Sequence, residues 1–428
     1  MKLFQQMLVA GASVSLLAPI AAQASDVVNL EEMSSYSRSN AKKSSRLDSK
    51  TFINEVSEDI ANLKGRVDGL EAKQNEFEAG SFSDTTTLDG KAIFTVGSVD
   101  TEGAKDGVSE GYTGEVVANY TYQMNLNSSF TGDDNLYVRL KTGNHDGWSD
   151  IKTPYNTYLS AGTGKSDNLQ VDKIWYSTPV GERNTIWIGP KIENYYMHGT
   201  TPSIYKSVLK AFTLGGNAAA YGASTSPGAG WAYNADNGFA ISSNFTTQDG
   251  ATTGILGDEG ATSWATQVGY TQPNYSVSAI LNQKYNGWTD EYFQSADGFA
   301  RPGDGNSSNI GLRAWWRPAD SGTATPEVSI GYDYSVLDGY DTNDTTDAFF
   351  VGLTWLDTFN PDDRLGIAFG QPQMRENTGA EPFMYEVYYG FKVNDSITVT
   401  PTIFGATNAN GTEGEDYTGA VIETQFKF

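Results

Sequence analysis

The side chains in this sequence that could act on a solute are cations placed on segments of alternating polarity. Between residues 135 and 142, Arg139 and Lys141 alternate with Leu136, Val138 and Leu140. Neighbouring side chains of a β-strand point to opposite faces, so the two cations share a face from which the apolar residues are absent. By the same argument we assign six cations to polar strand faces: Arg139, Lys141, Lys173, Lys191, Arg313 and Arg317.

Rows of fixed cations suit a channel wall that favours anions or hydroxylated solutes. The simpler interpretation is that a chain of formal charge −24 places its few cations wherever water is. The loops are acidic, for example at Asp133, Asp146 and Asp258. Because the cations are concentrated on strands instead, the pattern favours a cationic channel wall. The strong negative charge argues against nucleic acid or an anionic membrane surface as a partner.

Catalytic and metal-binding chemistry is not indicated. His145 and His198 are the only histidines, and neither has the spacing of a catalytic triad or a metal site. The stretches GEDYTG and DTNDTTD lack the ligand spacing of a calcium loop, so solvated loops explain them better. We therefore expect a protein that is not an enzyme and that has no cofactor and no bound metal.

The elements that must carry these cations are β-strands. From Gly80 onward the polarity pattern has a period of two, in a chain rich in Gly and aromatic residues and without cysteine. Sixteen strands are expected, at about 87–97, 112–125, 135–142, 170–178, 184–192, 230–234, 238–246, 262–271, 275–284, 308–317, 327–336, 347–356, 363–371, 384–393, 397–406 and 417–428.

The connections between these strands indicate a membrane barrel. Short ones such as PVGERN and NADNG alternate with long ones such as 143–169, 193–229 and 285–307. Short periplasmic turns, long outer loops and an even strand number are typical of outer-membrane barrels. A sheet edge cannot be exposed to lipid, so the last strand must pair with the first. We expect an all-β transmembrane fold, a sixteen-stranded antiparallel barrel.

The last eight residues, VIETQFKF, fit a closing strand. Ile422, Thr424, Phe426 and Phe428 share one face, which we assign to lipid, with Phe428 at the periplasmic rim. An edge strand of a soluble sheet would show the same local alternation. The terminal aromatic resembles the end that outer-membrane assembly machinery reads.

The third outer loop, 193–229, is the longest, and we expect it to fold inward and narrow the pore. Its segment TPSIYKSVLKAFTLGG predicts a short amphipathic helix that starts after Thr201 and Pro202 and stops at Gly215-Gly216. Lys206 and Lys210, one helical turn apart, would then face the same opening. The alternative is a helix that lies across the barrel mouth.

The region before the barrel predicts three further parts. Residues 1–24 have the lone charge, apolar run and AQA site of a signal peptide, and 25–51 form a polar, flexible segment. Within 52–80 a heptad seam predicts a periplasmic coiled coil, with a single helix on a core as the alternative. The seam residues are Ile53, Val56, Ile60, Leu63, Val67, Leu70 and Phe77. The barrel would occupy 81–428.

Three stretches carry a family resemblance: MKLFQQMLVA, LKGRVDGLEAKQNEFEAGSFSDTTTLDGKAIF and NSSFTGDDNLYVRLKTGN. They resemble cyanobacterial outer-membrane porins of the Som type, relatives of the carbohydrate-selective OprB porins. The resemblance implies a trimeric porin that passes sugars or inorganic ions, including iron. Family members commonly carry an S-layer-homology domain before the coiled coil, and residues 25–51 are too few for one. The basic cluster from Lys42 to Lys50 is a candidate substitute for cell-wall contact.

The leading hypothesis is thus an outer-membrane porin for passive diffusion of small hydrophilic solutes. Its partners would be outer-membrane lipids, further copies of itself in a homotrimer, the solutes, and peptidoglycan through the N-terminal segment. The main alternative is a structural anchor that links the membrane to the cell wall through a plugged barrel. A secreted glycan-binding β-protein would share the aromatic content but would not explain the alternating loop lengths.

Overall fold

The computed structural model describes residues 64, 66–67, 81–83, 85–100, 114–145, 159–216, 219–222, 225–248, 250–288, 305–319, 322, 324–339, 344–375, 380–408, 413–414 and 416–428. The chain forms two compact units, Met1–Ala72 and Lys73–Phe428. In the first, Lys64, Arg66 and Val67 are helical, and the expected signal peptide, polar segment and other seam positions lie outside the described residues. The coiled coil therefore stays a prediction. None of the helices in the described ranges is both long and apolar enough to span a membrane.

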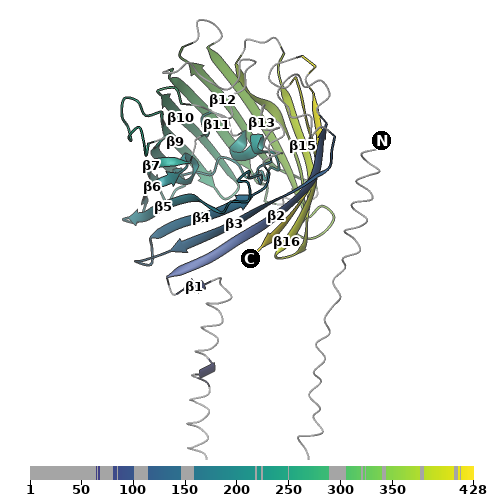
Figure 1. Cartoon of the computed structure of the whole chain (residues 1–428), viewed down its shortest axis with the longest axis horizontal. Coiled ribbons are helices and arrows are strands. Elements are labelled where there is room, and N and C mark those ends of the chain that lie inside the picture. The colour runs from purple at the N-terminus through teal and green to yellow at the C-terminus, as the bar shows by residue number, and fades with distance from the viewer. Residues whose placement is uncertain are drawn as a thin grey trace, which may run out of the picture. The chain divides into compact units, whose positions relative to one another are not determined.

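The second unit is a closed antiparallel barrel (Figure 1). A short β1 (Ser81–Ser83) pairs with the start of β2, and β2 to β17 form the ring. Its strands are β2 (Thr86–Asp100), β3 (Val117–Ser128), β4 (Asn135–Gly143), β5 (Gln170–Val180), β6 (Asn184–Ile192), β7 (Ser226–Asn234), β8 (Phe239–Thr247), β9 (Thr262–Gln272), β10 (Tyr275–Tyr285), β11 (Ser307–Trp316), β12 (Glu327–Leu337), β13 (Thr345–Leu356), β14 (Arg364–Arg375), β15 (Phe383–Asn394), β16 (Ile397–Thr407) and β17 (Tyr417–Lys427). The expected sixteen strands are confirmed.

The barrel closes where the sequence predicted. β17 pairs with β2 from Thr418–Asp100 to Lys427–Lys91, and the backbone groups of Gly90 and Phe428 exchange two further hydrogen bonds of 2.8 and 3.2 Å. The Phe428 ring stacks on Tyr122 of β3, with ring centroids 5.8 Å apart. The C-terminal aromatic is therefore part of the seam.

Gly90 makes room for the terminal ring. A Cβ at this position would lie 2.6 Å from the Phe428 ring and 2.7 Å from the carbonyl oxygen of Gln123. We expect Gly90→Ala to displace the ring and weaken the seam, so the folded barrel should unfold at a lower temperature, as measured by heat-dependent gel mobility. Gly257→Ala is the matched control because its nearest heavy atom is 3.6 Å away. Equal unfolding temperatures for the two variants would contradict this role of Gly90.

The connections up to β11 alternate in length, as expected. The turns 129–134, 181–183, 235–238, 273–274 and 395–396 are short, whereas 144–169, 193–225, 248–261 and 286–306 are long. The later connections do not alternate so regularly, because the turn 317–326 between β11 and β12 is longer than the outer loops 338–344 and 408–416. The short turns lie at the end of the barrel where β17 finishes, which is the periplasmic end in this architecture.

Candidate solute pathway

The third outer loop, 193–225, lies inside the barrel. We call it L3. In its first part, the Thr200 N–H donates to Gln267 of β9 at 3.0 Å, and Trp315 of β11 donates to the Thr201 carbonyl at 3.0 Å. On its way back, Ala219 donates to Gln373 of β14 at 2.7 Å. Figure 1 shows this teal segment within the ring of strands. The expected inward fold is therefore confirmed.

L3 does not contain the expected amphipathic helix. Residues 201–209 are not helical, and the loop has two 3-10 helices, η2 (Asn194–Met197) and η3 (Lys210–Gly215). The N–H groups of Val208 and Leu209, which a helix would bond to carbonyls one turn earlier, donate instead to Glu386 of β15. The expected stop is correct, because Gly216 has a φ of 114° that favours glycine.

Glu386 is the acceptor that fastens the middle of L3. Its carboxylate receives the Tyr205 hydroxyl at 2.9 Å, the Val208 N–H at 3.2 Å and the Leu209 N–H at 2.7 Å. Glu386 is fully buried. A buried carboxylate is stable only with such donors, so the loop and the wall depend on each other here.

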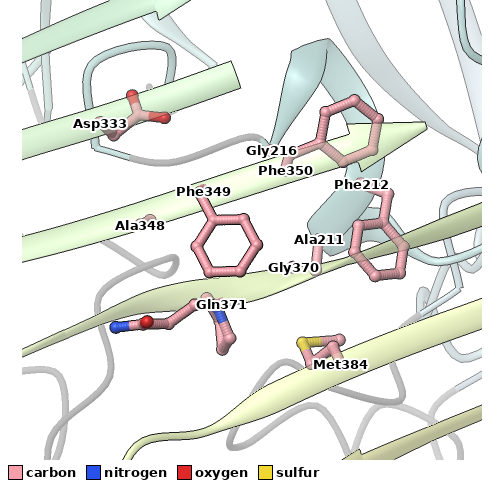
Figure 2. Close-up of a pocket in the computed structure, with 11 residues that line it drawn as sticks. Ala211, Phe212, Gly216, Asp333, Ala348, Phe349, Phe350, Gly370, Gln371 and Met384 are labelled. Atoms are coloured by element: carbon pink, nitrogen blue, oxygen red, sulfur yellow. The ribbon is translucent and has the colours of Figure 1, made fainter. Parts of the chain in front are cut away.

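Apolar packing holds the far end of L3 to the wall. Phe212 of η3 lies against Phe350 of β13, with ring centroids 5.8 Å apart, above Met384 of β15 (Figure 2). The cavity left between loop and wall measures about 10 Å³. That is room for about one water molecule, so this contact is closely packed.

A second loop segment also turns inward, which the sequence did not predict. Leu159 forms an isolated bridge with Leu209 of L3, and both are fully buried. The Thr121 hydroxyl of β3 donates to the Ala161 carbonyl at 2.8 Å. Residues 159–163 thus cover the outer ends of β3 and β4 from inside.

The water-exposed part of the inner wall is consequently one-sided. Inward side chains of β8 to β13 are buried beneath L3, for example Asn244, Gln267 and Asn282. In the periplasmic halves of β3, β4, β16 and β17, inward side chains such as Gln123 and Thr400 remain partly exposed. This second arc, which also includes the start of β2, is the part of the inner wall that is open to water.

Three of the predicted strand cations form ion pairs at the inner wall. Arg139 forms an ion pair with Asp172 and donates to the Tyr196 hydroxyl of L3 at 3.3 Å. Lys173 pairs with Glu193 at the base of L3. Arg313 is buried, forms a 2.8 Å ion pair with Asp333, and donates to the Leu214 carbonyl of L3 at 2.9 Å.

Lys141 and Arg317 occupy different levels of the wall. Lys141 lies close enough to Asp172 and Lys210 for charge interaction. Arg317 follows β11 at the periplasmic end, with its side chain 47 % exposed and bonded to Glu327 at 2.5 Å. Both lie on the inner side, as predicted, but only Arg317 is widely open to water.

Lys191 lies on the outer face, contrary to the prediction. Its neighbour Ile192 is fully buried and packs inward on Met197, so Lys191 points outward, where it pairs with Ile174. The reason is a register irregularity in β6 that begins after Gly189. Such a bulge reverses the alternation for the residues that follow it.

Lys206 and Lys210 do not face the same opening. Lys206 is exposed, and its charge interacts with Arg364, Lys427 and Arg317. Partial loss of water around its ammonium group lowers the pKa of Lys206, and these three cations lower it further. Lys210 instead interacts with Glu193 and Lys141. The extended backbone between them, rather than a helical turn, explains the difference.

Three inward-facing cations were not among the predicted site residues: Lys91, Arg364 and Lys427. Lys91 and Lys427 face each other across the β2–β17 seam, and Glu423 lies near Lys91. The sequence contained the signal, because Arg364 and Lys427 fall on the polar faces of their strands. Arg364, Lys427 and Arg317 lie within charge interaction of Lys206 on L3, and Lys91 lies within charge interaction of Lys427.

Aromatic side chains lie beside the Arg139–Asp172 pair. The rings of Tyr137 and Trp175 stack with centroids 4.9 Å apart, and Trp175 is 5.8 Å from Tyr196. Tyr137 donates its hydroxyl to Asn125 at 2.9 Å. Aromatic faces with adjacent charged and amide groups can contact both the apolar faces and the hydroxyls of polyols.

The histidines serve the packing of the loops. His145 lies 2.9 Å from the Thr95 hydroxyl and is buried, while burial lowers the pKa of His198 to about 3. Within the described ranges no cluster of His, Asp and Glu could hold a metal ion. The arrangement offers a wall and a constriction.

A closed barrel of this strand number, narrowed by an inward loop, defines a porin of the outer membrane. The sequence model of the carbohydrate-selective porin, OprB family, matches residues 46–428. The chain belongs to this family.

The chain also resembles a curated relative and several solved structures. An uncharacterized protein of Nostoc sp. is 28 % identical over 427 residues, covering 87 % of this chain and 71 % of the relative. The structure of Pseudomonas putida OprB covers 83 % of this chain and 96 % of its own length, with a TM-score of 0.57 and 13 % identity. An anion-selective porin from Comamonas acidovorans covers 80 % of this chain and 99 % of its own, with a TM-score of 0.55 and 12 % identity. These two likenesses show the fold alone.

Proposed function

We propose that this porin passes small hydroxylated and anionic solutes by diffusion along the arc formed by β2 to β4, β16 and β17. The observation that carries the proposal is the group of cations beside this arc, where the charge of Lys206 on the loop interacts with Lys427 of β17 and with Arg364 of β14. Like charges across a narrow passage raise the local concentration of anions and repel cations. The partly exposed rings of Tyr137 and Tyr196 would contact sugar-like solutes on their way.

Lys206→Glu is expected to shift the reversal potential in a salt gradient towards cation selectivity. The substitution places a negative charge among three cations in a passage where they are poorly screened. The shift should be larger at 0.1 M than at 1 M salt, because the Debye length falls from roughly 10 Å to about 3 Å. Planar-bilayer recordings of purified protein measure it directly.

Arg183→Glu is the matched control for Lys206→Glu. Arg183 carries the same charge but lies in a periplasmic turn, paired with Asp236, with both side chains largely exposed. Its reversal potential should stay close to that of the wild type. Equal shifts in the two variants, or none in either, would place Lys206 outside the solute path. Liposome swelling with neutral sugars should change little in both variants, because the charge does not act on an uncharged solute.

The proposed assembly adds partners to the pore. We propose a homotrimer in the outer membrane, with the coiled coil of residues 52–80 in the periplasm and the basic cluster from Lys42 to Lys50 near the cell wall. The family resemblance and the heptad seam support this arrangement. Crosslinking of intact cells followed by mass determination would measure the subunit number, and binding to purified peptidoglycan sacculi would test the wall contact.

A further inference from the structure

Two periplasmic turns of the barrel have the same internal construction. In 129–134, between β3 and β4, one carboxylate oxygen of Asp134 accepts the N–H groups of Phe130 and Thr131 at 2.9 and 2.8 Å. The hydroxyls of Ser129 and Thr131 also donate to it, each at 2.9 Å. The carboxylate thus fixes the backbone that precedes it.

The turn 357–363, between β13 and β14, repeats this arrangement. Asp363 accepts the N–H groups of Thr358, Phe359 and Asn360 at 2.6, 2.9 and 2.8 Å. In both turns a phenylalanine stands four residues before the aspartate. The two turns are therefore similar in sequence spacing and in hydrogen bonding, although they lie on separate parts of the circumference.

A tyrosine from the next strand locks each carboxylate on the outer side of the wall. Tyr176 of β5 donates to Asp134 at 3.0 Å, and Tyr389 of β15 donates to Asp363 at 2.5 Å. Tyr176 pairs across the sheet with Ile188, whose side chain is 63 % exposed on the lipid face. Both latches are thus built on the face that meets the membrane.

These hydrogen bonds keep the carboxylates charged. The Thr131 N–H is the main cause that lowers the pKa of Asp134 below its ordinary value. For Asp363, burial alone would raise the pKa, but the Tyr389 hydroxyl and the three backbone N–H groups lower it. The turns therefore remain fastened at neutral pH.

The construction exposes the two phenylalanines. Phe359 is 74 % exposed and Phe130 is 66 % exposed, more than any other large apolar side chain in the described part of the chain. Phe359 contacts the ring of Tyr389 at 5.4 Å, and Tyr389 stacks on Phe391 at 5.8 Å. An aromatic row thus runs from the lipid-facing wall into the turn.

We propose that Phe130 and Phe359 are membrane anchors that insert into the headgroup layer of the periplasmic leaflet. Aromatic side chains favour this layer at both ends of a barrel, and here the row extends beyond the strand ends into fixed turns. A fixed turn presents the ring without the entropy cost of ordering a flexible loop. Two such anchors on separate parts of the rim would resist tilting of the barrel.

The test uses the absence of cysteine from the sequence. Single variants Phe130→Cys and Phe359→Cys carry a nitroxide label in barrels reconstituted into phosphatidylcholine–phosphatidylglycerol vesicles. Power-saturation electron paramagnetic resonance then measures access of oxygen, which partitions into lipid, and of a nickel chelate, which stays in water. Glu182→Cys in an exposed turn is the water reference, and Ile188→Cys on the wall is the lipid reference.

Labels at 130 and 359 should give accessibilities between the two references, at the depth of the headgroups. Values equal to those at 182 would overturn the proposal in favour of solvated turns. Labels shielded from both oxygen and nickel would also overturn it, because they would indicate a protein contact instead of lipid. Heat-dependent gel mobility of each labelled protein shows that the barrel is folded, so every outcome can be interpreted.

Discussion

Replacing Glu386 with Leu is expected to detach L3 from the wall and to raise the single-channel conductance. The substitution leaves the Tyr205 hydroxyl and the N–H groups of Val208 and Leu209 without their acceptor in a buried site. Each buried donor without a partner costs about 1–3 kcal/mol, so the loop gains by moving into water. We expect a conductance increase of about twofold or more, with greater current noise, as the constriction widens.

Two comparisons make this experiment specific. Glu386→Gln keeps one acceptor oxygen and should give a smaller increase than Glu386→Leu. Asp236→Leu removes an exposed carboxylate from a periplasmic turn and should leave the conductance unchanged. A Glu386→Leu channel with wild-type conductance and wild-type heat-dependent mobility would mean that the apolar contacts of Phe212 hold L3 without the carboxylate.

Deleting Phe428 is expected to reduce the amount of folded barrel in the outer membrane severely, while synthesis and export continue. The residue contributes two backbone hydrogen bonds to Gly90 and the ring that stacks on Tyr122. Its loss opens the periplasmic end of the only seam that joins the two ends of the sheet. Outer-membrane fractionation with heat-dependent mobility measures the folded fraction.

Phe428→Tyr is the matched variant for the deletion. It retains the ring and the backbone bonds, so its yield should approach that of the wild type. Phe428→Ser keeps the backbone bonds but removes the ring, so it separates the two contributions. Normal yield of the deleted protein would contradict the closing role of the terminal residue.

Strand positions and faces could be predicted because alternation is a local property. The assignments of Arg313 and Phe428 needed only their own strands. The assignment of Lys191 was wrong because a register irregularity after Gly189 reverses the inward and outward alternation in β6. No sequence pattern marks this irregularity. Regular strands therefore allow prediction of facing, whereas a bulge must be observed.

The conformation of L3 could not be predicted, because distant residues determine it. Residues 201–209 have a helical pattern, yet Leu209 donates to Glu386, which is 177 positions away in the chain. The inward course of residues 159–163 likewise includes a bridge between Leu159 and Leu209, which are 50 positions apart in the chain. The cations could be identified from residue type and alternation. Which of them form buried ion pairs and which face water depends on the position of L3, which the sequence did not show.

Because L3 packs against one side of the barrel, substitutions on the inner wall are expected to affect stability differently on the two sides. Inside β8 to β13 the wall behaves like the interior of a soluble globule, where a lost methyl group or hydroxyl is felt in folding. In the periplasmic halves of β3, β4, β16 and β17, inner residues such as Gln123 and Thr400 are partly exposed to water, so they can vary at less cost to stability. Transport preference in such a molecule can drift by substitution on one arc, while the opposite arc maintains the architecture.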